Sequence, residues 1–171
     1  LIKGLSLDSR YISPGNIFIA INGKNFDGHK FLNNVKKNYA IGAIVEKNNP
    51  NYQIEELVDE NFFLIEDDDP LDFLYNLSKY HRKKLSCKMI SVTGSNGKTT
   101  SKDMIAKILV EGYEKGKTYS TFGNQNNHIG VPLNLLRIKE NNSYSVIEVG
   151  MNHPGEIKYL SDLVRPEVAL I

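Results

Sequence analysis

Residues 93–100 read Thr-Gly-Ser-Asn-Gly-Lys-Thr-Thr; they follow an apolar run, KMISVT at 88–93, and precede a helical pattern that begins at Lys98. Glycines allow a tight turn in which several backbone N–H groups point at one anion, and the helix N-terminus adds positive potential. A lysine at this turn can reach the β- and γ-phosphates of a nucleotide, and the Thr99 hydroxyl can ligate Mg²⁺. The stretch therefore predicts a strand, a phosphate-binding loop and a helix of an α/β domain.

The loop departs from the strict Walker pattern at one position. That pattern needs a glycine five residues before Gly97, where this chain has Val92, while the Gly-Lys-Thr-Thr end is intact. The alternative is a plain polar turn with a solvated lysine, and the order of strand, turn and helix disfavours it. The residues predicted to bind the nucleotide are Gly94, Ser95, Asn96, Gly97, Lys98, Thr99 and Thr100.

An acidic residue stands at the end of another strand-like run. Glu148 lies at the end of SYSVIEV (143–149), two residues before Gly150, so it is expected at the carboxyl edge of the sheet beside the loop. By itself, a glutamate at a strand end is more often a helix cap or an ion-pair member. Beside a phosphate loop, it can complete the coordination of a nucleotide-bound Mg²⁺. We therefore predict Lys98 and Glu148 as catalytic residues, and Thr99 and Glu148 as ligands of Mg²⁺.

The chain divides into two predicted domains, 1–84 and 85–171. From residue 88 onward, strands alternate with helices, which implies right-handed βαβ units and a parallel sheet. The expected helices are 98–111, 129–138 and 154–164, and the expected strands are 88–93, 118–121, 143–149 and 168–171. The first domain has strand-like runs at 16–22, 41–46 and 62–65 and a helical stretch around 31–35. A helix that opens at Asp68–Pro70 and ends in HRKK is expected to connect the two domains.

Composition narrows the class of protein. The 171 residues include 21 basic and 20 acidic ones, a net charge of +1, so nucleic acid is not the default partner. Cys87 is the one cysteine, no run of 18 apolar residues occurs, and the N-terminus lacks the apolar core of a signal peptide. Nothing implies an oligomer. We expect a fragment of a longer cytoplasmic enzyme, because the chain lacks an initiator Met and its last residues read as a strand that stops mid-sheet.

With these residues in hand, the sequence resembles the Mur ligases, ATP-dependent amide-forming enzymes of peptidoglycan assembly, over essentially all of its length. The matching segments are LDSR (7–10), PGNIFIA (14–20), FDGH (26–29), TGSNGKTT (93–100), TFGNQNN (121–127), IGVP (129–132), IEVG (147–150) and PGEI (154–157). The resemblance implies a small N-terminal α/β domain that binds a UDP-linked substrate, followed by the first part of a parallel-sheet P-loop ATPase domain. The segments at 121–132 and 154–157 favour the family member that joins D-alanyl-D-alanine to UDP-N-acetylmuramoyl-tripeptide.

Other functions stay open at this point. The loop alone also suits folylpolyglutamate synthetase, which the first domain excludes, and cyanophycin synthetase. Another Mur-type ligase, such as the one that adds the third peptide residue, and a nucleotide-binding module without ligase activity are further alternatives. A small-molecule P-loop kinase is possible, whereas a GTPase would carry an Asn-Lys-x-Asp motif that does not occur here.

The resemblance also implies roles for individual residues. It assigns Lys98 to the ATP phosphates, and Thr99 and Glu148 to Mg²⁺. The residues that it assigns to the UDP-muramoyl substrate are Ser9, Arg10, Asp27, His29, Asn124, Asn126 and Asn127, with Gly28 in the same region. Without the resemblance, the asparagines are equally consistent with a polar turn. Ser9 and Arg10 are then equally consistent with an ordinary turn. Position 128 is His where the family has an acidic residue, so His128 receives no catalytic role.

The implied reaction begins when ATP phosphorylates the terminal carboxylate of the muramoyl tripeptide. The amine of D-alanyl-D-alanine then attacks the acyl phosphate and phosphate leaves. A downstream histidine for a second Mg²⁺, a carbamylated lysine, the adenine contacts and a C-terminal domain all belong to the family and lie beyond Ile171. We therefore expect the 171 residues alone to fold at least in their first domain and not to catalyse ligation.

Overall fold

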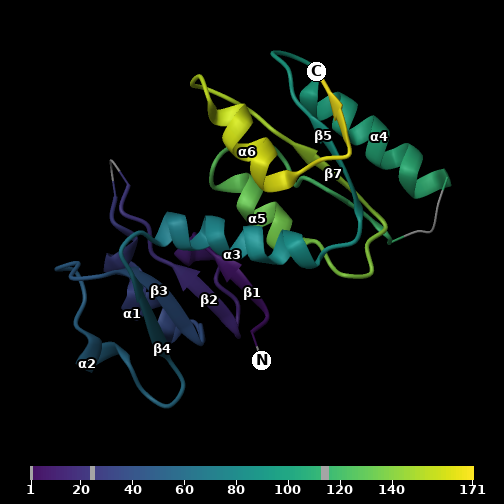
Figure 1. The fold of residues 1–171 in the computed structure, drawn as a ribbon. Coiled ribbons are helices and arrows are strands. Elements are labelled where there is room, and N and C mark those ends of the chain that lie inside the picture. Colours follow the sequence, from purple (N-terminus) through teal and green to yellow (C-terminus); the bar gives the residue numbers. More distant parts are fainter. Residues whose placement is uncertain (1, 24–25, 113–115) are drawn as a thin grey trace. The chain divides into compact units, whose positions relative to one another are not determined.

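The computed structural model describes residues 2–23, 26–112 and 116–171. The contacts divide the chain into two compact units, Leu1–Phe73 and Leu74–Ile171 (Figure 1). The division falls within helix α3 (Pro70–Lys84), because its later turns bond to the second unit. For example, His81 Nε2 lies 2.9 Å from the carbonyl of Ile138, and Arg82 Nε donates to the carbonyl of Val164. The domain boundary expected after residue 84 stays a prediction.

Unit 1 is built on a parallel sheet in the order β1-β2-β3-β4. The strands are β1 (Gly4–Ser6), β2 (Asn16–Ile19), β3 (Gly42–Glu46) and β4 (Phe63–Asp67). Two 3₁₀ turns, η1 (Ser9–Tyr11) and η2 (Gly28–Phe31), and two short helices, α1 (Leu32–Lys37) and α2 (Ile54–Leu57), connect them. The apolar runs of β2 and β3 are buried, as is typical of parallel strands covered by helices.

Unit 2 holds a second parallel sheet in the order β6-β7-β5-β8, so the parallel arrangement predicted for this half is confirmed. Its strands are β5 (Lys88–Val92), β6 (Thr118–Ser120), β7 (Tyr144–Glu148) and β8 (Val168–Leu170). Its helices after α3 are α4 (Lys98–Gly112), α5 (Gly130–Arg137) and α6 (Glu156–Val164). The expected 154–164 helix begins at Glu156, because Gly155 precedes it in the left-handed region with φ +92°.

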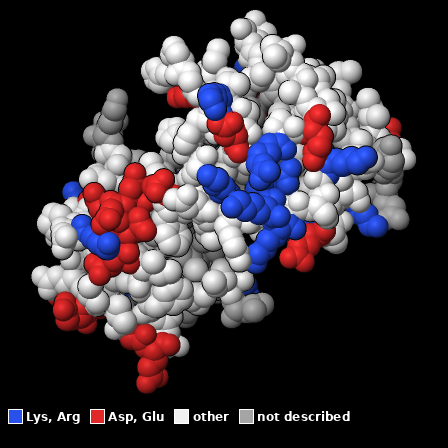
Figure 2. Space-filling model, viewed as in Figure 1, with Lys and Arg blue, Asp and Glu red and all other residues white. Residues whose placement is uncertain are grey.

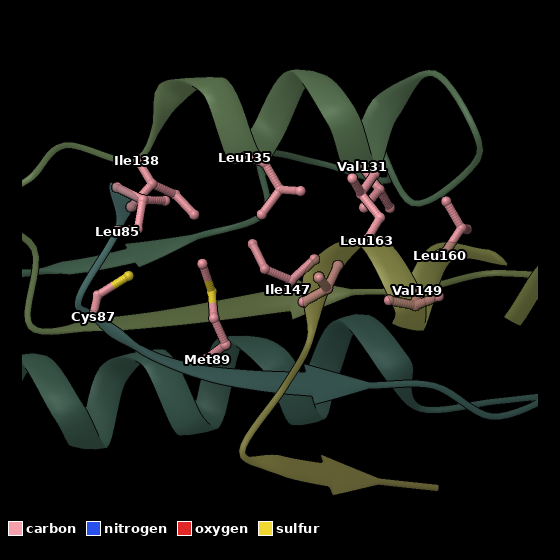
Figure 3. Packing of buried hydrophobic residues seen from close by; sticks show 11 residues of the cluster. Leu85, Cys87, Met89, Val131, Leu135, Ile138, Ile147, Val149, Leu160 and Leu163 are labelled. Carbon is pink, nitrogen blue, oxygen red and sulfur yellow. The ribbon is translucent and has the colours of Figure 1, made fainter. Parts of the chain in front are cut away.

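Helices cover the two faces of this second sheet. Met89, Ile147, Leu135 and Leu163 belong to one buried cluster between the sheet and α5 with α6 (Figure 3). Alternate side chains point to opposite faces of a strand, so Val146, the neighbour of Ile147, packs instead with residues of α4. The sheet is therefore the middle layer of three, and its carboxyl edge stays available to loops.

The register between β5 and β7 fixes the position of the loop relative to the acid. Val92, the last residue of β5, is the Cα partner of Glu148, the last residue of β7. Both strands are parallel, so the segments that follow them emerge at the same edge of the sheet. In parallel α/β sheets this edge is where ligands bind.

Candidate functional site

The segment at residues 93–100, called the phosphate loop below, turns sharply between β5 and α4. Gly94 and Gly97 have φ values of +132° and +78°, a region in which side-chain-bearing residues are strained. Helix α4 begins at Lys98, and its first turn has N–H groups with no partner within the helix. The loop thus has the backbone shape and the helix terminus that anion binding requires.

The ammonium of Lys98 folds back over this loop. Its Nζ donates to the carbonyl of Gly94 at 2.6 Å and to that of Ser95 at 3.3 Å. The ammonium is therefore held beside the loop by two uncharged carbonyl acceptors. A phosphate oxygen is a stronger acceptor for an ammonium than a carbonyl is, so an incoming phosphate group can take over these bonds.

Glu148 is the buried acid of the site, with 1% of its surface exposed. Its Oε2 accepts a hydrogen bond from the Thr99 hydroxyl at 2.9 Å, and its Oε1 accepts one from Asn126 Nδ2 at 2.7 Å. A hydroxyl and a carboxylate brought together are the hard oxygen donors that Mg²⁺ prefers. The donor set therefore fits the magnesium role that the sequence predicted for Thr99 and Glu148.

The segment at residues 121–127, called the asparagine segment below, approaches the acid from the end of β6. The backbone N–H of Gly150 donates to the Asn126 carbonyl at 2.8 Å, so the segment is also tied to the end of β7. Asn127 Oδ1 accepts from the N–H groups of Ile129 and Gly130 at 3.1 and 2.8 Å and caps the start of α5. Asn124 is exposed. Of the three predicted asparagines, the structure brings Asn126 alone into contact with Glu148.

Sequence reasoning missed three buried polar residues that support this site: Lys102, Thr121 and Asn134. Thr121 is 2% exposed, and its Oγ1 accepts the backbone N–H of Glu148 at 2.9 Å. Lys102 is 3% exposed, and its Nζ donates to the Thr121 carbonyl at 3.0 Å. Lys102 follows the phosphate-loop lysine by one helical turn, which is the signal that could have drawn attention to it.

Asn134 is fully buried, and its amide holds the asparagine segment on α5. Its Oδ1 accepts from the Tyr119 hydroxyl at 2.6 Å and from the Phe122 N–H at 3.2 Å. Its Nδ2 donates to the carbonyls of Gln125 at 3.0 Å and Gly130 at 2.7 Å. These bonds use both donors and both acceptor sites of the amide. A polar residue inside the apolar run GVPLNLLR was the available sequence signal.

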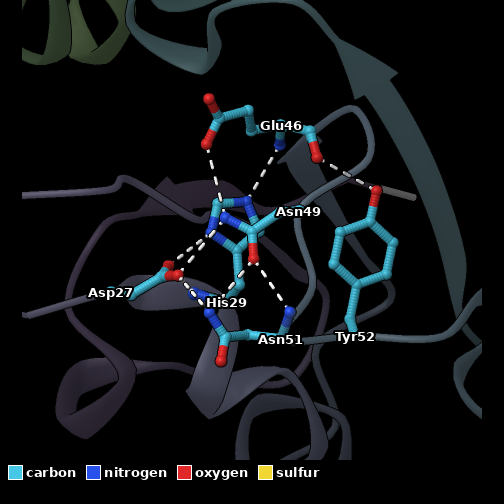
Figure 4. Close-up of polar contacts among 6 residues, drawn as sticks. All are labelled: Asp27, His29, Glu46, Asn49, Asn51 and Tyr52. Carbon is cyan, nitrogen blue, oxygen red and sulfur yellow. Dashed lines mark hydrogen bonds and ion pairs between the residues drawn. The ribbon is translucent and has the colours of Figure 1, made fainter.

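In unit 1, Asp27 and the buried His29 belong to a part-buried hydrogen-bond network (Figure 4). His29 is 1% exposed; its Nδ1 lies 2.5 Å from Asp27 Oδ1, and its Nε2 lies 2.9 Å from the backbone N of Glu46. Nε2 must accept from that N–H, so we assign the ring proton to Nδ1. Both ring nitrogens are thereby hydrogen-bonded within the protein, and the substrate role predicted for His29 stays a prediction.

Asp27 is the centre of that network. Its Oδ1 accepts the His29 backbone N–H at 2.9 Å, and its Oδ2 accepts from Asn49 at 3.2 Å and Asn51 at 2.7 Å. Burial raises the pKa of the Asp27 carboxyl, but the hydrogen bonds from His29 and Asn49 outweigh it and leave the pKa below its ordinary value. Nearby, burial and Glu66 raise the pKa of the Tyr52 hydroxyl, which donates to Glu66 at 2.8 Å.

Ser9 and Arg10 lie at a separate pocket of unit 1, about 290 Å³ in volume. Its lining combines apolar and polar side chains: Leu7, Asp8, Ser9, Arg10, Phe18, Phe26, Gly28 and Phe31. The exposed Arg10 guanidinium is held by Asp8 in two bonds of 2.9 and 2.6 Å. Hydrogen bonding by Arg10 lowers the pKa of the Asp8 carboxyl. The pocket thus offers aromatic surface beside the Arg10–Asp8 ion pair.

Charge is unevenly distributed over the visible faces of the units. In Figure 2, Asp and Glu side chains gather over unit 1, whereas Lys and Arg side chains gather over unit 2. The last turn of α3, in unit 2, carries Arg82, Lys83 and Lys84. Within the described ranges, no helix has the length and apolarity needed to cross a membrane.

The fold and site of unit 2 define a parallel α/β protein with a P-loop arrangement of strand, glycine turn and helix. Residues 1–82 match the family described as Mur ligase family, catalytic domain, and residues 92–171 match the Mur ligase middle domain. The chain therefore belongs to the Mur ligase family.

Three relatives illustrate this membership. The UDP-N-acetylmuramoyl-tripeptide–D-alanyl-D-alanine ligase of Bacillus subtilis is 39% identical over 171 residues, which is all of this chain and 35% of the relative. The solved UDP-N-acetylmuramoylalanyl-D-glutamyl-2,6-diaminopimelate–D-alanyl-D-alanyl ligase of Acinetobacter baumannii is 37% identical with a TM-score of 0.83, over 98% of this chain and 35% of that one. The MurF ligase of Thermotoga maritima, solved in complex with ADP, is 30% identical with a TM-score of 0.75, over 95% and 35%. The chain thus spans about 35% of the length of these relatives.

Proposed function

We propose that this chain forms the substrate-binding and phosphate-binding parts of an ATP-dependent ligase that adds D-alanyl-D-alanine to UDP-N-acetylmuramoyl-tripeptide. The reaction belongs to peptidoglycan precursor synthesis and takes place in the cytoplasm, and the enzyme is of the acid–amino-acid ligase type, EC 6.3.2. The observation that carries the proposal is the contact of Thr99 with Glu148 over 2.9 Å, directly beside the Lys98 loop. The names of the relatives, and the ADP bound to one of them, support the same reaction.

In this mechanism the phosphate loop binds the ATP phosphates. Its backbone N–H groups orient the γ-phosphate, and Lys98 moves from the Gly94 and Ser95 carbonyls to the phosphate oxygens. Phosphoryl transfer depends chiefly on alignment and on positive charge around the transferred group. Thr99 and Glu148 would hold Mg²⁺, which supplies further positive charge at the phosphates. The terminal carboxylate of the tripeptide takes the γ-phosphoryl group and ADP leaves. The amine of D-alanyl-D-alanine then attacks the resulting acyl phosphate, which forms the amide bond and releases phosphate.

The asparagine segment connects the predicted substrate-binding residue Asn124 with Glu148 through Asn126. Asn126 donates to Glu148 Oε1 and so orients the carboxylate toward Thr99. Asn127 caps α5, and Asn124 is exposed and able to reach a ligand. We therefore assign Asn124 to the UDP-muramoyl substrate, Asn126 to positioning of the acid, and Asn127 to the fold of the segment.

The UDP end of the substrate fits the Ser9–Arg10 pocket of unit 1. Phe26 and Phe31 offer faces on which a uracil ring can stack, and Arg10 offers a cation for a diphosphate. Asp27 and His29 support this region from inside: η2 begins directly after Asp27, and Gly28 and Phe31 of η2 line the pocket. We propose that they shape the binding surface without touching the ligand.

Calorimetric titration of the purified chain tests both binding assignments. UDP-N-acetylmuramoyl-tripeptide and Mg-ATP are titrated separately into the wild type, Lys98→Ala and Lys107→Ala, the last being an exposed lysine of the same helix. We expect Lys98→Ala to lose binding of Mg-ATP and to keep binding of the UDP compound. Lys107→Ala should bind both ligands as the wild type does. A wild-type chain that binds Mg-ATP but not the UDP compound would contradict the substrate and favour another nucleotide-dependent function. Ligation is then assayed in an enzyme of the relatives' full length.

A further inference from the structure

Lys102 is a lysine almost without solvent contact, in the second turn of α4. Its side chain is 4% exposed, and its Nζ bonds to the Thr121 carbonyl at 3.0 Å and pairs with Asp103 Oδ1 at 2.9 Å. Burying an ammonium costs free energy that a carbonyl and a half-solvated carboxylate compensate only in part. An apolar side chain of the same length would fill the space without that cost. The position of this charge therefore calls for a role beyond packing.

The partner of Lys102 leads directly to the acid of the site. Thr121 receives Lys102 on its carbonyl, and its own hydroxyl receives the backbone N–H of Glu148 at 2.9 Å. Its backbone N–H donates to Val146 at 3.0 Å, so Thr121 is bonded through its amide, its carbonyl and its side chain. Lys102 thus holds Thr121, the residue through which the asparagine segment is bonded to the end of β7.

The same helix also holds the other end of the acid. Thr99, three residues before Lys102 and hence on the same side of α4, donates to Glu148 Oε2. One face of α4 therefore fixes Glu148 twice: directly at its carboxylate through Thr99, and at its backbone through Lys102 and Thr121. A rigid support of this kind is what a metal-binding carboxylate needs to keep a productive geometry.

We propose that Lys102 is a positioning residue: acting through Thr121, it holds the Glu148 carboxylate opposite Thr99 in the geometry that binds the nucleotide-linked divalent cation. The inference rests on the proposed role of Thr99 and Glu148 as metal ligands. Its consequence is that loss of the Lys102 ammonium weakens metal binding more than it weakens the fold or the binding of the UDP-linked substrate.

The test measures Mn²⁺ binding by electron paramagnetic resonance in the presence of ATP, with Mn²⁺ as a paramagnetic substitute for Mg²⁺. The variants are Lys102→Met, which keeps the stem and removes the ammonium, and Thr121→Val, which removes the hydroxyl acceptor of Glu148. Thr121→Ser keeps that hydroxyl and is the conservative control; Lys107→Met removes an exposed lysine from the same helix. Supporting partners of metal ligands typically account for about 10–100-fold in metal affinity.

We expect Lys102→Met and Thr121→Val to lose Mn²⁺ affinity by about 10-fold or more, with Thr121→Ser and Lys107→Met unchanged. Binding of UDP-N-acetylmuramoyl-tripeptide should be unchanged in all four variants. Wild-type Mn²⁺ affinity in a folded Lys102→Met protein would overturn the proposal; if that variant does not fold, wild-type affinity in Thr121→Val overturns it equally. All variants are made in an enzyme of the relatives' full length. A wild-type enzyme of that length that binds no Mn²⁺–ATP at all would contradict the proposed function instead, so the two failures are distinguishable.

Discussion

The Thr99 hydroxyl donates to Glu148 Oε2 at 2.9 Å, which joins the first turn of α4 to the last residue of β7 across 49 positions of sequence. The bond exists because β5 and β7 are neighbouring parallel strands that end in register at Val92 and Glu148. Any ligand that binds the phosphate loop therefore meets a buried carboxylate at the same edge of the sheet. The predictions below start from this contact and move outward.

Glu148→Gln keeps the shape of the side chain and removes its charge. An amide is a much poorer ligand for Mg²⁺ than a carboxylate, and a preorganised electrostatic group of this kind typically accounts for about 10²–10³ in kcat. We expect a loss of that order in ligase turnover of the full-length enzyme, with the affinity for the UDP-linked substrate retained. Steady-state kinetics at several Mg²⁺ concentrations measure it. Turnover within about 3-fold of the wild type would exclude Glu148 from the magnesium site.

Gly150→Ala tests how closely the ends of the asparagine segment and β7 approach. A Cβ at Gly150 would lie 2.8 Å from Asn126 Oδ1 and 2.9 Å from its Cγ, so Asn126 has to leave Glu148. Such overpacking typically costs about 1–3 kcal/mol of stability. Gly112→Ala is the matched control, since a Cβ there meets no atom of the described residues within 4 Å. Urea unfolding should show Gly150→Ala destabilised and Gly112→Ala unchanged or slightly stabilised; equal stability of the two would contradict the observed contact.

The sequence predicted that Lys98, Thr99 and Glu148 lie at one edge of the sheet, but it did not predict the residues that support them. Lys98 and Thr99 belong to one continuous motif, and Glu148 could be placed because the carboxyl ends of parallel strands share an edge. Lys102, Thr121 and Asn134 were missed. The spacing of Lys102 from Lys98 and the apolar run around Asn134 were local signals, but the partners of these side chains are not visible in the sequence. Lys102 and Thr121, for example, are 19 residues apart, and no local pattern marks their contact.

The first unit shows the same limit. Strand β1 has three residues, Gly-Leu-Ser, too few for an alternating pattern, and the run expected at 16–22 pairs as a strand only to Ile19. The resemblance assigned His29 to the substrate, yet both ring nitrogens face Asp27 and Glu46. A motif indicates where a function lies, whereas burial and hydrogen bonding distinguish the residues that touch a ligand from those that hold the loop.

Asn134→Leu removes the amide that ties the asparagine segment to α5 and keeps the number and branching of the side-chain heavy atoms, although leucine is the larger residue. The Phe122 N–H, the Gln125 carbonyl and the Tyr119 hydroxyl then lose a partner in part-buried surroundings. The Gly130 carbonyl loses one in buried surroundings. Each unsatisfied buried group costs about 1–3 kcal/mol, so we expect a loss of at least that amount. Urea unfolding of the chain measures it. Leu133→Asn, at a neighbouring helix position with intermediate burial, is a useful comparison for the effect of leucine–asparagine exchange itself.

Acid should weaken unit 1 through Asp27. Hydrogen bonds from His29 and Asn49 keep the folded pKa of this carboxyl below its ordinary value of 3.8. A lowered folded pKa means that the ionised carboxylate contributes stability above 3.8, which is lost as the pH falls through the folded pKa. Asp27→Asn should therefore be less stable than the wild type near neutral pH, and the gap should narrow below pH 3.8. Thermal melts across pH measure this gap, with the exposed Glu60→Gln as control; a gap constant with pH would contradict the assignment.

Arg10→Ala should separate the two binding functions. Arg10 is 78% exposed in its side chain and is already aimed by Asp8, so its removal deprives the pocket of a cation without disturbing the core of unit 1. Hydrogen bonds to charged groups contribute about 1.5–3 kcal/mol, which corresponds to about 10–100-fold in affinity. We expect that loss for UDP-N-acetylmuramoyl-tripeptide in calorimetric titrations, with Mg-ATP binding unchanged. If Arg10→Lys recovers most of the affinity, a positive charge is sufficient at this position. If it does not, the diphosphate is bound by a bidentate contact that requires the guanidinium. Undiminished binding of the UDP compound by Arg10→Ala would place its UDP end outside this pocket.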